Sequence, residues 1–146
     1  ISGAIRVQYV SDDSTTAIIS TALDFTDVNQ SAIRAFDGNC TEDVTEFKWH
    51  IHVKWNASYS SAAFAQCSKA ATGNHYDPLK ACGPNSEFAD TPDCAGKTAS
   101  YACNPSNYTR DPLVCEKGDL SGKFGAFKIN AMSTTVVEEF VDEHYP

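Results

Sequence analysis

The histidines are the residues of this sequence best suited to chemistry, because a neutral imidazole is the commonest metal ligand among side chains. The chain has four of them, and His50 and His52 are separated by one residue in a run where apolar and polar residues alternate. Alternate side chains of a β-strand project from the same face, so both imidazoles can converge on one metal ion. Two unrelated surface histidines would show the same spacing.

The strand that must position this pair is expected over residues 46–55. Lys48 and Lys54 flank the two histidines on its polar face, where they could draw an anion toward a bound metal, although two solvated lysines are the simpler interpretation. The residues between them are large and apolar and should face the core. These are Phe47, Trp49, Ile51, Val53 and Trp55.

The rest of the chain favours an all-β fold. Short runs rich in β-branched residues, separated by Gly, Asp and Asn, predict a sandwich or barrel. We expect strands over residues 5–10, 16–25, 31–36, 124–129 and 134–141. Residues 60–115 show no strand pattern and hold five of the six cysteines, so they should form a long loop stapled by disulfides.

The cysteines and sequons indicate an oxidising, extracellular or cell-wall location. An even number of cysteines without a Cys-x-x-Cys pair favours disulfides over a zinc knuckle, and we expect all six to be bonded. They are Cys40, Cys67, Cys82, Cys94, Cys103 and Cys115, and glycosylation sequons begin at Asn29, Asn39, Asn56 and Asn107. The net charge of −8 argues against nucleic acid as a partner, and no run is apolar enough to span a membrane.

A third histidine, His75, makes the pattern more specific. Residues 49–52, Trp-His-Ile-His, look like the copper-binding strand of the copper/zinc superoxide dismutases. Residues 73–78, Gly-Asn-His-Tyr-Asp-Pro, are similar to that family's loop motif, and Cys67 precedes them as a cysteine does in the family. Residues 118–123, Gly-Asp-Leu-Ser-Gly-Lys, resemble its Gly-Asp-Leu segment in the form that fungal copper-only members carry. The resemblance runs from about Ser2 to Val141.

The resemblance implies one domain over residues 1–146, a Greek-key β-barrel or flattened β-sandwich. It implies one copper ion per monomeric chain, bound by His50, His52 and His75, and dismutation of superoxide to oxygen and hydrogen peroxide. The alternative is a non-catalytic extracellular module of the same fold, either copper-binding or free of metal.

Two positions depart from the zinc-containing members, so the resemblance implies no zinc. Glu116 stands where a zinc histidine is found, and Gly83 stands where another is expected. Only Asp119 of the zinc set remains, and zinc is usually held by about four ligands. In copper-only members the residue matching Glu116 accepts a hydrogen bond from the histidine matching His75; a solvated loop carboxylate is the alternative. For Asp119 we expect a supporting role near the site or a tether in a turn.

The family's fourth copper histidine, its active-site arginine and the cysteine that pairs with the Cys67 position would all lie beyond Pro146. The chain is therefore expected to lack the last strand, either as a shortened sequence or as a variant. His144 is the remaining candidate for a fourth ligand, with a loop residue as the alternative.

Overall fold

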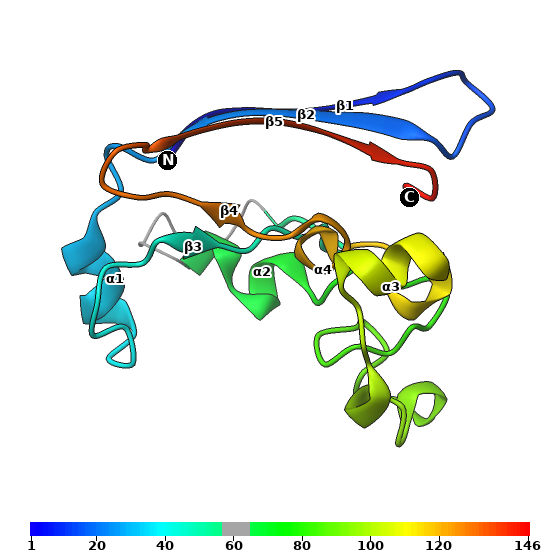
Figure 1. Ribbon diagram of the computed structural model, residues 1–146. Coiled ribbons are helices and arrows are strands. Elements are labelled where there is room, and N and C mark those ends of the chain that lie inside the picture. The colour runs from blue at the N-terminus through cyan, green and yellow to red at the C-terminus, as the bar shows by residue number, and fades with distance from the viewer. Residues whose placement is uncertain (57–64) are drawn as a thin grey trace. The chain divides into compact units, whose positions relative to one another are not determined.

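The computed structural model describes residues 1–56 and 65–146, which fall into two compact units (Figure 1). The first unit contains residues 1–48 and 126–145. The second contains residues 49–125 together with Pro146. The single domain expected over residues 1–146 stays a prediction.

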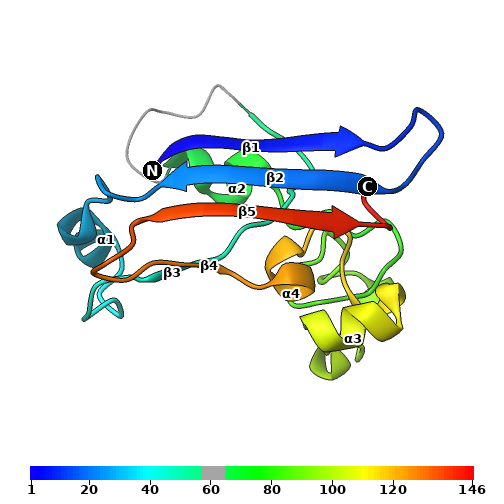
Figure 2. The same cartoon turned by 45° about the horizontal axis from the view of Figure 1, so that its top comes forward.

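A three-stranded antiparallel sheet forms the first unit, in the order β1-β2-β5 (Figure 2). Its strands are β1 (Ser2–Tyr9), β2 (Ala17–Asp24) and β5 (Thr135–Asp142). The fully buried Ile19 of the central strand is paired with Val7 on one side and with Phe140 on the other. These strands match three of the predicted runs because their β-branched residues suit a pleated, half-buried surface.

The predicted strand over residues 31–36 is wrong, because this segment is the helix α1 (Gln30–Phe36). Asn29 caps the helix, its side-chain oxygen accepting a hydrogen bond from the backbone N–H of Ala32 at 2.8 Å. Asparagine at this position satisfies one of the free N–H groups of the first turn. The capping signal outweighed the apolar residues that had indicated a strand.

The long strand expected over residues 46–55 is mostly absent. Only β3 (Glu46–Phe47) is a strand, and it pairs with β4 (Phe127–Lys128) in a two-stranded sheet of the first unit. The ring of Phe47 lies 4.6 Å from that of Phe25, centroid to centroid. In the second unit the extended backbone after Trp49 pairs with loops rather than with a neighbouring strand.

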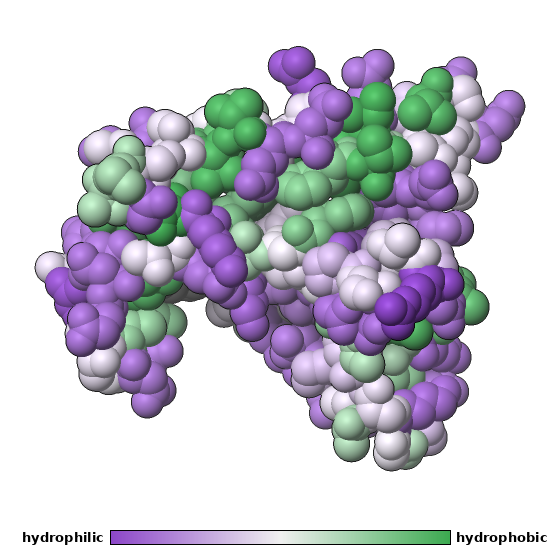
Figure 3. Space-filling model, in the orientation of Figure 1, coloured by the Kyte–Doolittle hydropathy of each residue, from purple (hydrophilic) through white to green (hydrophobic). Residues whose placement is uncertain are grey.

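The expectation of an all-β Greek-key barrel or flattened sandwich is wrong. The structure is a small mixed α/β fold with 24% helix and 24% strand, and no barrel is present among the described residues. Among residues 1–56 and 65–146, both outer strands of the three-stranded sheet pair with β2 alone, so no described strand closes either edge. Apolar side chains reach the surface along this sheet (Figure 3), among them Val137 and Val141 of β5.

The second unit is built from short helices and irregular backbone, as expected for the stapled region. Capping side chains begin all three α-helices described in this unit: Ser68, Asn104 and Asp119. The α-helices are α2 (Lys69–Thr72), α3 (Pro105–Arg110) and α4 (Leu120–Phe124), and the 3₁₀ helices are η1 (Ala65–Cys67), η2 (Pro92–Cys94), η3 (Thr98–Ser100) and η4 (Pro112–Val114).

Two disulfides join cysteines of this unit, Cys82 to Cys94 and Cys103 to Cys115. The prediction of disulfide staples is therefore confirmed for these four cysteines. Cys40 and Cys67 are free thiols in this structure, which differs from the expectation that all six are bonded. Each bridge closes a segment of 12 residues and reduces the chain entropy that ordering an irregular loop would cost.

Candidate metal centre

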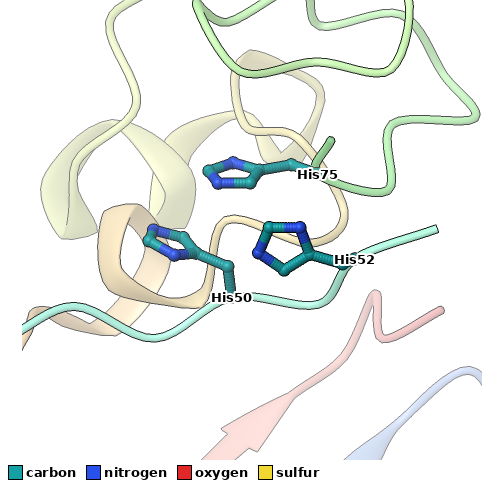
Figure 4. Close-up of side chains that lie close together, drawn as sticks. All are labelled: His50, His52 and His75. Atoms are coloured by element: carbon teal, nitrogen blue, oxygen red, sulfur yellow. The ribbon is translucent and has the colours of Figure 1, made fainter. Parts of the chain in front are cut away.

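Three imidazoles gather in the second unit, and they form a group that could hold a metal ion (Figure 4). His50 and His52 come from the extended segment after Trp49, and His75 comes from the loop after α2. One ligand nitrogen of each lies within 4.8 Å of the others. The ring centroid of His75 is 4.1 Å from that of His50 and 5.2 Å from that of His52. The structure thus brings together the three histidines expected from the sequence.

Backbone hydrogen bonds bring the histidine segments together. His52 and His75 form an isolated antiparallel β-bridge. The N–H of Val53 donates to Asn74 at 3.1 Å, and the N–H of Tyr76 donates to Ile51 at 3.0 Å. Two segments far apart in the sequence are therefore held together by a small, regular network, although the described residues form no sheet here.

A third segment joins the same network. The carbonyl of Gly118 accepts a hydrogen bond from the N–H of Ile51 at 2.9 Å, and the N–H of Gly118 donates to the carbonyl of Tyr76 at 2.8 Å. A Cβ at position 118 would lie 2.3 Å from the carbonyl oxygen of Ile51, so only glycine permits this close approach. The approach carries Glu116 and Asp119 toward the histidines.

The ring of His52 is held by the C-terminal end of α2. Its Nδ1 lies 3.0 Å from the carbonyl oxygen of Gly73 and 3.2 Å from the hydroxyl of Thr72. A carbonyl can only accept, so this contact places the proton on Nδ1 and leaves Nε2 as the basic nitrogen. His52 is exposed at the surface, so its ring orientation depends on this anchor.

The ring of His75 is held by a buried carboxylate. Its Nδ1 lies 2.7 Å from Oε2 of Glu116, and the two residues are 7% and 1% exposed. This is the contact implied by the resemblance, and the burial excludes a solvated loop carboxylate. A carboxylate that accepts the Nδ1 proton selects the tautomer in which Nε2 is the metal-binding nitrogen.

Burial shapes the properties of Glu116. It raises the pKa of the carboxyl group, and the hydrogen bond and charge of His75 oppose this rise. The second oxygen, Oε1, is buried without a hydrogen-bond partner among the described residues. Position 83 closes the space around it, since a Cβ there would lie 2.1 Å from Oε1. Gly83, which the sequence marked only as a missing zinc histidine, is therefore part of the support for His75.

Asp119 caps α4 and also lies near His50. As the cap of α4 it accepts a hydrogen bond from the N–H of Gly122 at 2.8 Å. The same oxygen, Oδ1, is 3.7 Å from Nε2 of His50. The other oxygen accepts a hydrogen bond from the hydroxyl of Tyr101 at 2.8 Å.

Tyr101 is a residue that the sequence did not single out. Its hydroxyl also accepts a hydrogen bond from the backbone N–H of Glu116 at 3.1 Å. Burial raises the pKa of Tyr101 well above its ordinary value, and the neighbouring Asp119 adds to the rise. The phenol therefore stays neutral and remains a hydrogen-bond donor at physiological pH.

An open pocket of about 330 Å³ gives access to His50 and His52. Lys54 is part of its lining, so positive charge is present where an anion would approach. Lys48, the other lysine expected near the site, belongs to the first unit. The pocket is lined by His50, His52, Lys54, Trp55, Cys67 and Thr72.

A second group of potential ligands lies elsewhere in this unit, formed by Asp77, Cys82 and Cys94. The two sulfurs are joined in a disulfide, so they offer no thiolate. Asp77 accepts hydrogen bonds from the backbone N–H groups of Ala81 and Cys82 and from the hydroxyl of Ser86. This buried carboxylate therefore organises its loop.

His144 lies in the first unit, after β5, where its N–H donates to Asp142 at 3.0 Å. Its role as a fourth ligand stays a prediction, as does glycosylation. Asn29 and Asn39 are exposed, whereas the side-chain amide of Asn107 donates to the carbonyl of Ala102 at 2.8 Å. The sequon of Asn56 continues into residues outside the described part of the chain.

None of the helices in the described part of the chain has the length and apolar character needed to cross a bilayer. Comparison of the chain with family models gave no match. Comparisons with curated proteins and with solved structures gave none either.

Proposed function

We propose that this chain binds one copper ion through His50, His52 and His75 and uses it to dismutate superoxide, as the resemblance of its motifs implies. The observation that carries the proposal is the buried contact between His75 and Glu116, at 2.7 Å. A surface histidine cluster without function would gain nothing from a carboxylate withdrawn from water, because burying such a charge is costly.

The donor set suits copper. Imidazole nitrogen is a good ligand for Cu(II), which also heads the divalent affinity series. His52 and His75 each direct one nitrogen at an oxygen acceptor and leave the other for a metal. Bound copper would supply one-electron chemistry, accepting an electron from one superoxide anion and returning it to a second, which leaves as hydrogen peroxide with two protons.

The chain's own residues orient the histidine rings and admit a small anion to the site. Glu116 keeps the proton of His75 on Nδ1, and the carbonyl of Gly73 does the same for His52. The open pocket admits a small anion, and Lys54 contributes positive charge to its lining. The two disulfides and the four sequons support an extracellular location for this activity.

The test is reconstitution of the purified, disulfide-intact chain with copper and zinc together, followed by elemental analysis. We expect one equivalent of copper and no zinc, and we expect His75→Ala to lose the copper. Stoichiometric zinc at a separate chelator-resistant site would contradict the copper-only proposal. Dismutation should be followed by pulse radiolysis with His75→Ala as the control, because free copper also dismutates superoxide.

A second candidate is a copper-binding module without turnover. The observation that favours it is the size of the ligand group, three histidines in the described part of the chain, with the ring of His52 exposed. Copper binding at one equivalent, with a dismutation rate no higher than that of the copper-treated His75→Ala chain, would support this candidate over the enzyme.

A further inference from the structure

We propose that Tyr101 is a positioning residue for the metal centre, because its hydroxyl connects the residues that face His75 and His50. The inference rests on the proposed metal-binding function and extends it to a residue outside the ligand set. Tyr101 belongs to none of the three motifs by which the site was found.

The hydroxyl of Tyr101 makes two hydrogen bonds in opposite senses. It accepts from the backbone N–H of Glu116 at 3.1 Å and donates to Oδ2 of Asp119 at 2.8 Å. A phenol has one proton to donate and lone pairs to accept with, so both capacities are used. Glu116 then holds Nδ1 of His75, while Oδ1 of Asp119 lies 3.7 Å from Nε2 of His50. One hydroxyl therefore fixes the supports of two imidazoles.

The phenol is itself held in place. A Cβ at position 83 would lie 2.9 Å from Cζ of Tyr101, so Gly83 packs directly against the ring. The disulfide from Cys103 to Cys115 links the backbone two residues after Tyr101 to the residue before Glu116. Removing the hydroxyl would leave the backbone N–H of Glu116, a residue that is 1% exposed, without its acceptor.

The test uses Tyr101→Phe, which retains the ring. The first readout is the Nδ1–H signal of His75 in nitrogen-15 NMR of the metal-free chain. We expect the variant to shift this signal upfield and to speed its exchange with water at least 3-fold, since its acceptor is less well fixed. The second readout is Cu(II) affinity by chelator competition, which should fall about 3- to 10-fold, less than the loss of a direct partner.

Tyr108→Phe is the matched control. Tyr108 is a buried tyrosine of the same unit whose ring packs against Phe124, at 5.9 Å between centroids. Its replacement should change thermal stability without moving the His75 signal. If Tyr101→Phe fails to fold, Asp119→Asn weakens the acceptor of the same hydroxyl, keeps the helix cap, and must move the His75 signal in the same direction.

A folded Tyr101→Phe chain with the wild-type His75 signal and wild-type copper affinity would overturn the inference, even if the wild type binds copper. If the wild type binds no copper but the His75 signal still shifts in the variant, the proposed function falls and the positioning role of Tyr101 stands.

Discussion

Replacing Gly83 by alanine should damage the proposed metal centre through Glu116, although it adds a single methyl group. A Cβ at position 83 would lie 2.1 Å from Oε1 of Glu116 and 2.9 Å from Cζ of Tyr101, whereas ordinary contacts begin at 3.4 Å. The carboxylate must therefore retreat by roughly 1 Å, which carries its contact with His75 beyond hydrogen-bonding distance. That contact is 2.7 Å long in the native chain.

The expected magnitude follows from the contact that is lost. Loss of the partner that orients a ligating histidine lowers metal affinity about 10- to 100-fold, or about 1.4–2.7 kcal/mol. Overpacking should also lower the free energy of unfolding of the metal-free chain by about 1–3 kcal/mol. Cu(II) affinity is measured by competition with a chromophoric chelator, and stability is measured by thermal unfolding.

Gly38→Ala is the matched control, because a Cβ at position 38 would meet no atom within 4 Å. A double-mutant cycle identifies the route: if Gly83→Ala acts through Glu116, adding Glu116→Gln should lower the affinity little further. A folded Gly83→Ala chain with wild-type copper affinity, or fully additive losses in the cycle, would refute this account of the site.

Three further outcomes are expected. Burial raises the pKa of Tyr101 above its ordinary 10.0, so the stability contributed by the neutral phenol is present below pH 10 and is lost as the pH rises toward the folded-state pKa. Alkaline unfolding measured by circular dichroism should accordingly be less steep in Tyr101→Phe. Asp77→Asn should lower the free energy of unfolding by about 3 kcal/mol, because the fully buried carboxylate accepts from Ser86 and two backbone N–H groups; an unchanged melting temperature would contradict this. Thiol titration of the denatured, unreduced chain should find two free thiols, those of Cys40 and Cys67. If the titration finds no free thiol, these two cysteines form a third disulfide.

The sequence predicted which histidines come together better than it predicted the elements that carry them. Alternation placed His50 and His52 on one side of an extended segment, which needs only local backbone geometry. The same alternation predicted that the apolar residues between the polar ones face the core. Trp49 is buried as predicted, yet Trp55 is 63% exposed. Period-two alternation reports an extended chain, and it does not show whether a strand or a loop will pair with it. His75 was found from its motif alone.

Short β-branched runs predicted an all-β fold and the resemblance implied a Greek-key barrel; both were wrong, and one of the errors has a clear local cause. The run at residues 31–36 follows a capping asparagine, Asn29, that favours a helix. Tyr101 could not have been predicted at all. Its partners, Glu116 and Asp119, lie 15 and 18 residues away along an irregular loop, where no periodicity links them.

The disulfide between Cys103 and Cys115 makes the proposed metal centre depend on whether the chain has been oxidised. It closes the backbone beside Tyr101 and Glu116, two residues on which the geometry of His75 depends. In a reducing compartment the same sequence would lack this closure, and the loop would regain much of its conformational freedom. If the chain binds copper as proposed, its copper affinity would be linked to oxidation: the newly made chain would compete poorly for the metal until this disulfide has formed.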